Sequence, residues 1–167
     1  MVGESREDAS LNIGHPSRLI CKSFDYTFAG NAVQLIVPNK GVSVSKLMNG
    51  SEEVWTAEEE EAFDHAEIYL NRDGRAELAV LILRTSSGLS RRDYARDENG
   101  WAVCDNSEDK MLSLVVITQC ISNFELDLSA SSDTKECTIF QVELLGVTTK
   151  HFYPKPGHVS SRLMMVQ

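Results

Sequence analysis

The amino-acid sequence predicts a mainly β protein made of antiparallel sheets, in a sandwich or half-barrel-like arrangement, with at most short helical turns and an α+β fold as the fallback. Short runs rich in β-branched and aromatic residues recur along its 167 residues. Turn sequences such as Asn49-Gly50 separate these runs, and several runs alternate apolar with polar side chains. The length fits one domain or two small ones, and a hydrophobic content of 42% is ordinary for a globular chain.

The first part of the chain divides into a lead-in and a β domain. Residues 1–17 are polar and are interrupted by Gly14 and Pro16, so we expect a flexible lead-in that can include one short strand at Leu11–Ile13. Residues 18–110 are expected to form the β domain, with hairpins around 71–74 and 97–100. Its expected strands are Leu19–Phe28, Ala32–Val37, Val42–Met48, Glu53–Thr56, Ala66–Leu70, Leu78–Thr85, Tyr94–Arg96 and Trp101–Cys104.

Residues 111–167 form the last expected segment. Its opening part, 111–124, is apolar and fits either a strand or a helix, and the β-branched residues at 115–118 favour a strand. Three further strands are expected near Thr138–Leu144, Thr148–Tyr153 and Val159–Val166.

These last strands repeat an earlier part of the chain at a constant offset of 116 residues. The matched residues are Cys21, Phe24, Gly30, Pro38, Gly41, Ser45, Leu47 and Met48, which recur as Cys137, Phe140, Gly146, Pro154, Gly157, Ser161, Leu163 and Met164. The repeat predicts two copies of one three-stranded meander with glycines at its corners. The second copy is partial, so either its strands pack on the first unit or the chain is part of a longer repeated protein.

The order and spacing of the motifs resemble a known family, the FAINT domain of the SfiI-subtelomeric-fragment-related proteins of Theileria. The resemblance covers about residues 24–105 and its opening part again from 126. The residues that carry it are Pro38 and Gly41, Lys46-Leu47, Asn49-Gly50, Val54-Trp55, Ala66–Leu70, Asp73-Gly74, Leu78–Leu83 and Asn99-Gly100-Trp101. It implies a secreted parasite polypeptide, delivered to the host cell or the parasite surface, with no established catalytic role. The start of this chain has no apolar stretch, so we expect no signal peptide in it.

The negative charge is concentrated in one segment. The chain has 16 Lys and Arg against 25 Asp and Glu, a net charge of −9, and residues 52–67 contain eight of the acids with no Lys or Arg. This balance argues against general binding to nucleic acid or to an anionic membrane, and no apolar run approaches the roughly 20 residues that span a bilayer. The segment is either a solvated face, in which Thr56-x-x-Glu59 favours one helical turn, or a docking strip for a basic protein partner. The candidate partner-binding residues are Glu58, Glu59, Glu60, Glu61 and Asp64.

No catalytic, cofactor-binding or metal-binding residue is predicted. The four cysteines form no C-x-x-C pair and have no histidine at zinc-ligand spacing. They fit either two disulfides in an exported protein or, for Cys21 and Cys137, small buried side chains. Trp55 and Trp101 are expected in the core.

We therefore expect a non-catalytic module that acts by protein–protein interaction with a host or parasite factor. A structural surface antigen is one alternative. An unrecognised enzyme, built for example on a spatial pair of Cys104 and His65, is the other.

Overall fold

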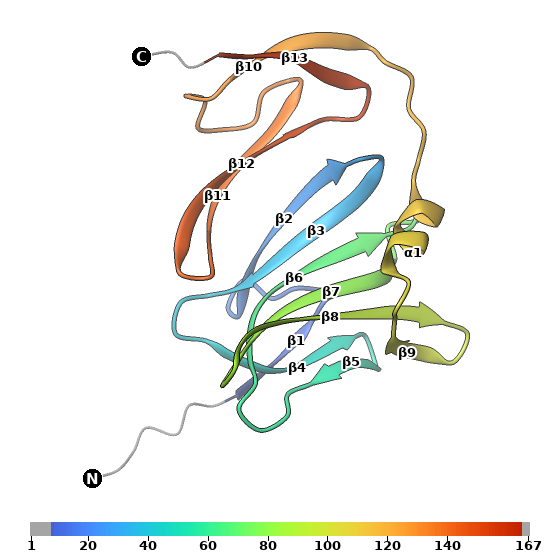
Figure 1. Ribbon diagram of the computed structural model, residues 1–167, viewed down its shortest axis with the longest axis vertical. Coiled ribbons are helices and arrows are strands. Elements are labelled where there is room, and N and C mark those ends of the chain that lie inside the picture. Colours follow the sequence, from blue (N-terminus) through green and yellow to red (C-terminus); the bar gives the residue numbers. More distant parts are fainter. Residues whose placement is uncertain (1–7, 165–167) are drawn as a thin grey trace.

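The computed structural model describes residues 8–164 and is mainly β, as predicted (Figure 1). Residues 1–7 of the expected lead-in and the end of the last expected strand lie outside the described residues. The elements, in chain order, are β1 (Asp8–Asn12), β2 (Cys21–Phe28), β3 (Asn31–Pro38), β4 (Ser43–Asn49), β5 (Glu52–Thr56), β6 (Ala62–Leu70), β7 (Ala76–Thr85), β8 (Gly88–Asp97), β9 (Gly100–Val103), α1 (Ser107–Leu114), β10 (Ser122–Asp127), β11 (Cys137–Leu144), β12 (Val147–Pro154) and β13 (His158–Met164).

The first unit is a β-sandwich. One layer is an antiparallel six-stranded sheet in the order β2-β3-β6-β7-β8-β9, and the other is the three-stranded sheet β1-β4-β5. Side chains from the two layers meet in one core, where Leu47 and Trp55 of the small sheet pack with Ile36, Ile68 and Leu81 of the large one. Ile36, Leu47, Ile68 and Leu81 are fully buried, so this core holds the two layers together.

Turn chemistry accounts for the hairpin of β6 and β7. The side-chain Oδ1 of Asn71 accepts hydrogen bonds from the backbone N–H groups of Asp73 (2.9 Å) and Arg75 (3.0 Å). Gly74 takes a φ of +77°, which a residue with a Cβ adopts only with strain. The predicted hairpin at 71–74 is confirmed.

The backbone reproduces the sequence repeat. The strands β11 and β12 start and end 116 residues after β2 and β3, and both hairpins have the same register, with Cys21 opposite Pro38 and Cys137 opposite Pro154. Both hairpins turn through two residues of positive φ, at 29–30 and at 145–146. Each copy is therefore the same local structure, built twice.

Two strand pairs are parallel, in contrast to the predicted antiparallel pairing. In the first copy β1 pairs with β4, and in the second β10 pairs with β13. Each pair has an irregularity at a matching position, between Ala9 and Ser10 and between Phe124 and Glu125. The first strand of each copy, β1 or β10, and its parallel pairing are therefore part of the repeated unit.

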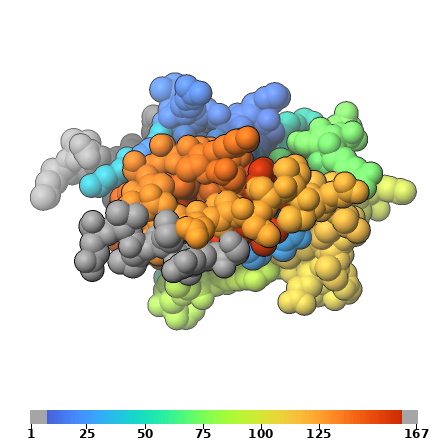
Figure 2. Space-filling view, turned by 90° about the horizontal axis from the view of Figure 1, so that it is seen from above, coloured from blue at the N-terminus to red at the C-terminus, as the bar shows by residue number. Residues whose placement is uncertain are grey.

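The two copies pack against each other through the outer faces of their hairpins. Phe24 and Phe140 are equivalent residues, and their rings stack with centroids 4.5 Å apart. Tyr26 stacks on Tyr153 at 3.8 Å, and Val33 and other apolar residues of the large sheet complete this second core. Figure 2 shows the C-terminal strands, in orange and red, covering the blue and green strands of the first unit.

The short strand expected at Leu11–Ile13 is present as β1, which begins earlier, at Asp8, and pairs with β4. Leu11 and Ile13 are 1% and 3% exposed. Two local predictions were wrong. The expected helical turn after Thr56 is a tight turn, in which the N–H of Glu61 donates to the carbonyl of Glu58. Residues 115–118 belong to an extended linker that follows α1, outside every described strand.

Candidate binding surfaces

The acidic segment splits into an exposed turn and a neutralised part. Glu58, Glu59 and Glu60 are exposed in the turn that joins β5 to β6. By contrast, the carboxylate of Glu61 lies 3.0 Å from Arg92, and its side chain is only 5% exposed. Asp64 is 11% exposed and lies 3.1 Å from Arg84.

Of the five residues predicted to bind a basic partner, Glu61 and Asp64 therefore already pair with arginines of the same chain. Partner binding by the five residues stays a prediction. The neutralising arginines stand on β7 and β8, some 20 or more residues further along the chain. Sheet pairing brings these arginines beside β6. The sequence of the acidic segment does not predict these ion pairs, because the arginines are distant in the chain. The acidic surface available to a partner is the turn Glu58–Glu60.

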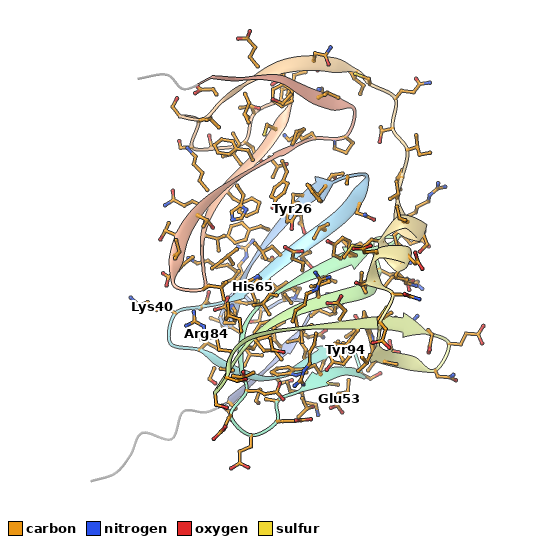
Figure 3. All side chains as sticks on the ribbon, viewed as in Figure 1. Tyr26, Lys40, Glu53, His65, Arg84 and Tyr94 are labelled. Carbon is orange, nitrogen blue, oxygen red and sulfur yellow. The ribbon has the colours of Figure 1, made fainter. Side chains whose placement is uncertain are left out.

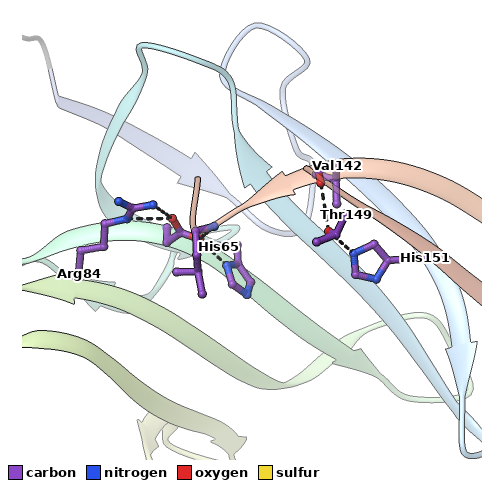
Figure 4. A network of polar contacts seen from close by, with 7 residues as sticks. His65, Arg84, Val142, Thr149 and His151 are labelled. Carbon is purple, nitrogen blue, oxygen red and sulfur yellow. Dashed lines mark hydrogen bonds and ion pairs between the residues drawn. The ribbon is translucent and has the colours of Figure 1, made fainter. Parts of the chain in front are cut away.

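Asp64 is the centre of a polar network that joins the two units (Figure 4). Its Oδ2 lies 2.6 Å from Nδ1 of the buried His65 and accepts a hydrogen bond from the backbone N–H of Leu145 at 3.2 Å. Its Oδ1 accepts a hydrogen bond from Nε of Arg84. Because Leu145 lies at the tip of the hairpin β11–β12, this carboxylate fixes that tip to the first unit.

A second group of polar contacts lies on the outer face of that hairpin, which packs against the first unit. The hydroxyl of Thr149 donates to the carbonyl of Val142 at 3.1 Å and lies 2.7 Å from Nε2 of His151. The ring of His151 stacks on Phe140 at 5.1 Å. Burial lowers the pKa of His151, an effect that the charge of Glu67 opposes.

A cleft of about 810 Å³ separates the hairpin tip from the loop that joins β3 to β4. It is lined by three cations, Lys22, Lys40 and Arg84, and by two carboxylates, Asp64 and Glu143. Lys40 and Arg84 stand on the same side of the molecule in Figure 3. Because cations and carboxylates are mixed along its walls, the charge of the cleft favours neither an anionic nor a cationic ligand.

The second copy has an open strand edge at β12. In a two-residue hairpin the backbone groups of one strand point alternately toward the partner strand and away from it, so those of Thr148, Lys150 and Phe152 point outward. Their equivalents in β3, at 32, 34 and 36, pair with β6 in the first unit. No other strand within residues 8–164 pairs with this edge of β12.

The apolar residues beside this edge are correspondingly less buried than their counterparts. Ile36 is 0% exposed beneath β6, whereas Phe152 at the same repeat position is half-buried. Likewise, Ile13 is 3% exposed and its counterpart Leu128 is half-buried. The second copy is thus half of a sandwich, with part of its inner face accessible.

Comparison with protein-family models matches residues 11–87 to FAINT, a domain of unknown function (DUF529). Residues 11–87 are a FAINT domain. No curated protein and no solved structure matches the chain.

The FAINT match runs from the end of β1 to the turn after β7. The strands β8 and β9 extend the large sheet beyond the match, and β10–β13 repeat β1–β4 of the FAINT domain. The sequence resemblance placed the start of the domain near residue 24, within β2, and so left out β1, which is short and polar.

The remaining candidate residues have structural positions. All four cysteines are free thiols, and Cys21 and Cys137 are buried at equivalent positions, as predicted, where burial raises their pKa. His65 bonds to Asp64, and no hydrogen bond to Cys104 is found in the part of the chain that the structure describes. Trp55 is buried in the core and Trp101 packs against it, which confirms that prediction.

Residues 8–164 show neither a metal-binding cluster nor a membrane-spanning helix. They contain no group of three or more His, Cys, Asp or Glu side chains placed to hold a metal ion. Their helix, α1, has eight residues and does not meet the length and apolarity required to cross a membrane.

Proposed function

We propose that the chain is a non-catalytic protein-binding module whose binding surface is the second, incomplete copy of the FAINT repeat. The observation that supports this proposal is the outer edge of β12, where the backbone groups of Thr148, Lys150 and Phe152 have no strand partner among the described residues. An edge of this kind binds an extended polypeptide through main-chain hydrogen bonds.

Two contributions to the binding free energy favour a polypeptide at this edge, main-chain hydrogen bonds and burial of apolar surface. Each main-chain hydrogen bond contributes only about 0.5–1.5 kcal/mol net. Burial of the half-exposed Phe152 and Leu128 adds about 25 cal/mol for each Å² of apolar surface removed from water. Main-chain pairing and apolar burial would act together at this edge, because the apolar residues lie directly beneath it.

An affinity capture from host-cell lysate tests the proposal with two matched variants. Lys150→Pro removes one outward N–H and is tolerated at a strand edge, because that N–H bonds to no strand of the described chain. The triple variant Glu58→Lys, Glu59→Lys, Glu60→Lys changes the acidic turn instead. We expect Lys150→Pro to lose the captured partner and the triple variant to keep it, with circular dichroism unchanged in both.

The opposite result would move the function to the acidic turn. Capture that is lost in the triple variant, kept in Lys150→Pro and weakened by salt would identify a basic partner at Glu58–Glu60. Capture that neither variant changes would contradict binding through both surfaces. Salt-insensitive association with membranes or carbohydrate would favour a structural surface antigen.

We also propose that the protein is exported by a parasite to its surface or its host cell, which is what the FAINT resemblance implies. Localisation of an epitope-tagged copy in infected cells tests this. Signal outside the parasite is expected, and signal confined to its interior would contradict export.

A further inference from the structure

We infer that the open edge of β12 binds an extended segment of a partner protein that carries an apolar residue, then any residue, an acidic residue, any residue and a second apolar residue. The inference rests on the proposed function and names the chemistry of the partner. It follows from the first copy of the repeat, which shows the same edge with a strand seated on it.

The seated strand is β6. In the first unit Ile36 of β3 faces Ala66 of β6, and Ala32 faces Leu70. These two partner residues are apolar and close the core between the sheets. The equivalent positions in β12 are Phe152 and Thr148, so an antiparallel strand on β12 would place apolar residues opposite them.

The central position differs between the two copies and sets the charge of the partner. Gln34 of β3 faces Ile68, and both side chains are uncharged. Lys150 replaces Gln34 in β12 and is exposed. Opposite charges across an antiparallel pair are stabilising and like charges are destabilising, so the residue opposite Lys150 is acidic in the segment that fits best.

A folded second copy of the chain does not supply this segment. Its own β6 is paired on one edge with β3 and on the other with β7. Pairing of two β12 strands about Lys150 would place two like charges opposite each other. The occupant is therefore a free, extended segment of another polypeptide.

The probe is a synthetic peptide of residues 62–71 in which Ile68 is replaced by Glu. We expect a one-to-one complex in which the amide protons of Thr148, Lys150 and Phe152 become protected from exchange with solvent. The amides of Thr149 and His151, which already bond to β11, change little. A rise in sedimentation coefficient to that of a dimer of the protein, rather than binding of one peptide, would overturn the assignment of the occupant.

Two matched pairs of probes test register and charge separately. N-methylation of the peptide at position 68, whose N–H faces β12, abolishes binding, whereas N-methylation at position 67, whose N–H faces away, preserves it. Replacing the acid at position 68 by Lys weakens binding about two- to five-fold. The protein variant Lys150→Glu reverses that preference and leaves the backbone pairing intact.

Failure of this inference and failure of the proposed function are distinguishable. If position 67 and position 68 tolerate N-methylation equally, or if the three outward amides are already protected in the free protein, the inference is overturned. If Lys150→Pro still loses the partner captured from lysate, the binding function survives with a partner of different chemistry.

Discussion

The carboxylate of Asp64 accepts a hydrogen bond from the backbone N–H of Leu145, a residue 81 positions further along the chain, at 3.2 Å. The same carboxylate binds Arg84 and His65 within its own unit. One half-buried acid therefore joins the first copy of the repeat to the tip of the second.

Replacing Asp64 by Ala is expected to release the hairpin tip. A hydrogen bond to a charged group contributes about 1.5–3 kcal/mol, so unfolding measured in urea should show a loss of about that size. Exchange of the Leu145 amide should accelerate more than that of amides in β7. Glu59→Ala, at an exposed acid, is the control, and equal effects of the two variants would remove Asp64 from this role.

Phe140→Ala tests whether the aromatic stack with Phe24 holds the two copies together. Phe140 is 9% exposed, and removal of a buried Phe typically costs about 3–5 kcal/mol. Because Trp55 and Trp101 both lie in the first unit, their fluorescence should report that unit still folded while exchange in β11 and β12 increases. Leu89 of β8, which is 63% exposed, gives the control variant Leu89→Ala. Simultaneous loss of the tryptophan signal would show that the first unit depends on the second.

Alanine substitutions at Gly30 and Gly74 distinguish two causes of lost stability, backbone strain at positive φ and a steric clash of the added Cβ. Both glycines have positive φ, +81° and +77°. A Cβ on Gly30 would lie 2.7 Å from Val115 of the linker, whereas a Cβ on Gly74 meets nothing within 4 Å. We expect Gly74→Ala to cost about 1–2 kcal/mol from strain alone, and Gly30→Ala to cost about 1–3 kcal/mol more.

Amide exchange locates the additional cost of Gly30→Ala. The N–H of Val116 donates to the carbonyl of Gly30 at 2.9 Å, so its exchange should accelerate as the linker is displaced. Equal stability losses for the two alanine variants, with Val116 unaffected, would show that the linker contact contributes nothing.

His151 should make the docking of the second copy sensitive to acid. Burial lowers its pKa from the ordinary value of 6.5, and Glu67 and His65 are the charged groups that act on it, in opposite directions. A lowered folded-state pKa gives stability that is full above about pH 6.5 and is lost as the pH falls through the folded value. The free energy of unfolding can be measured in urea for the wild type and for His151→Gln from about pH 7 to pH 5. It should fall less with decreasing pH in the variant than in the wild type. A difference that does not change with pH would contradict this assignment.

Much of the fold was predictable from local sequence. The turn residues at 71–74 and 97–100 predict their hairpins, because Gly74 and Gly100 take positive φ there and the side chain of Asn71 accepts hydrogen bonds from the backbone of its turn. The constant offset of 116 residues predicts that two segments share one backbone, and the two hairpins have the same register.

The segments that local sequence predicts least well are those whose structure depends on distant partners. The strand β1 is polar and short, and it is stabilised by β4, which lies beside it in parallel. The β-branched residues at 115–118 favour a strand locally, but their backbone finds no strand partner among the described residues and instead contacts the turn at Gly30. Local preference contributes about 1 kcal/mol at most, so the available partner decides.

By itself, the sequence determined the mainly β class, the positions of the tight turns, the duplicated meander and the FAINT relationship, because turn residues and period-two alternation act over a few neighbouring residues. Only the tertiary structure decided which acids are neutralised, how the copies pack through Phe24 and Phe140, and which strand edge is left open. Those outcomes depend on pairing between strands 20 to more than 100 residues apart, and backbone hydrogen bonds carry no residue-specific signal in the sequence.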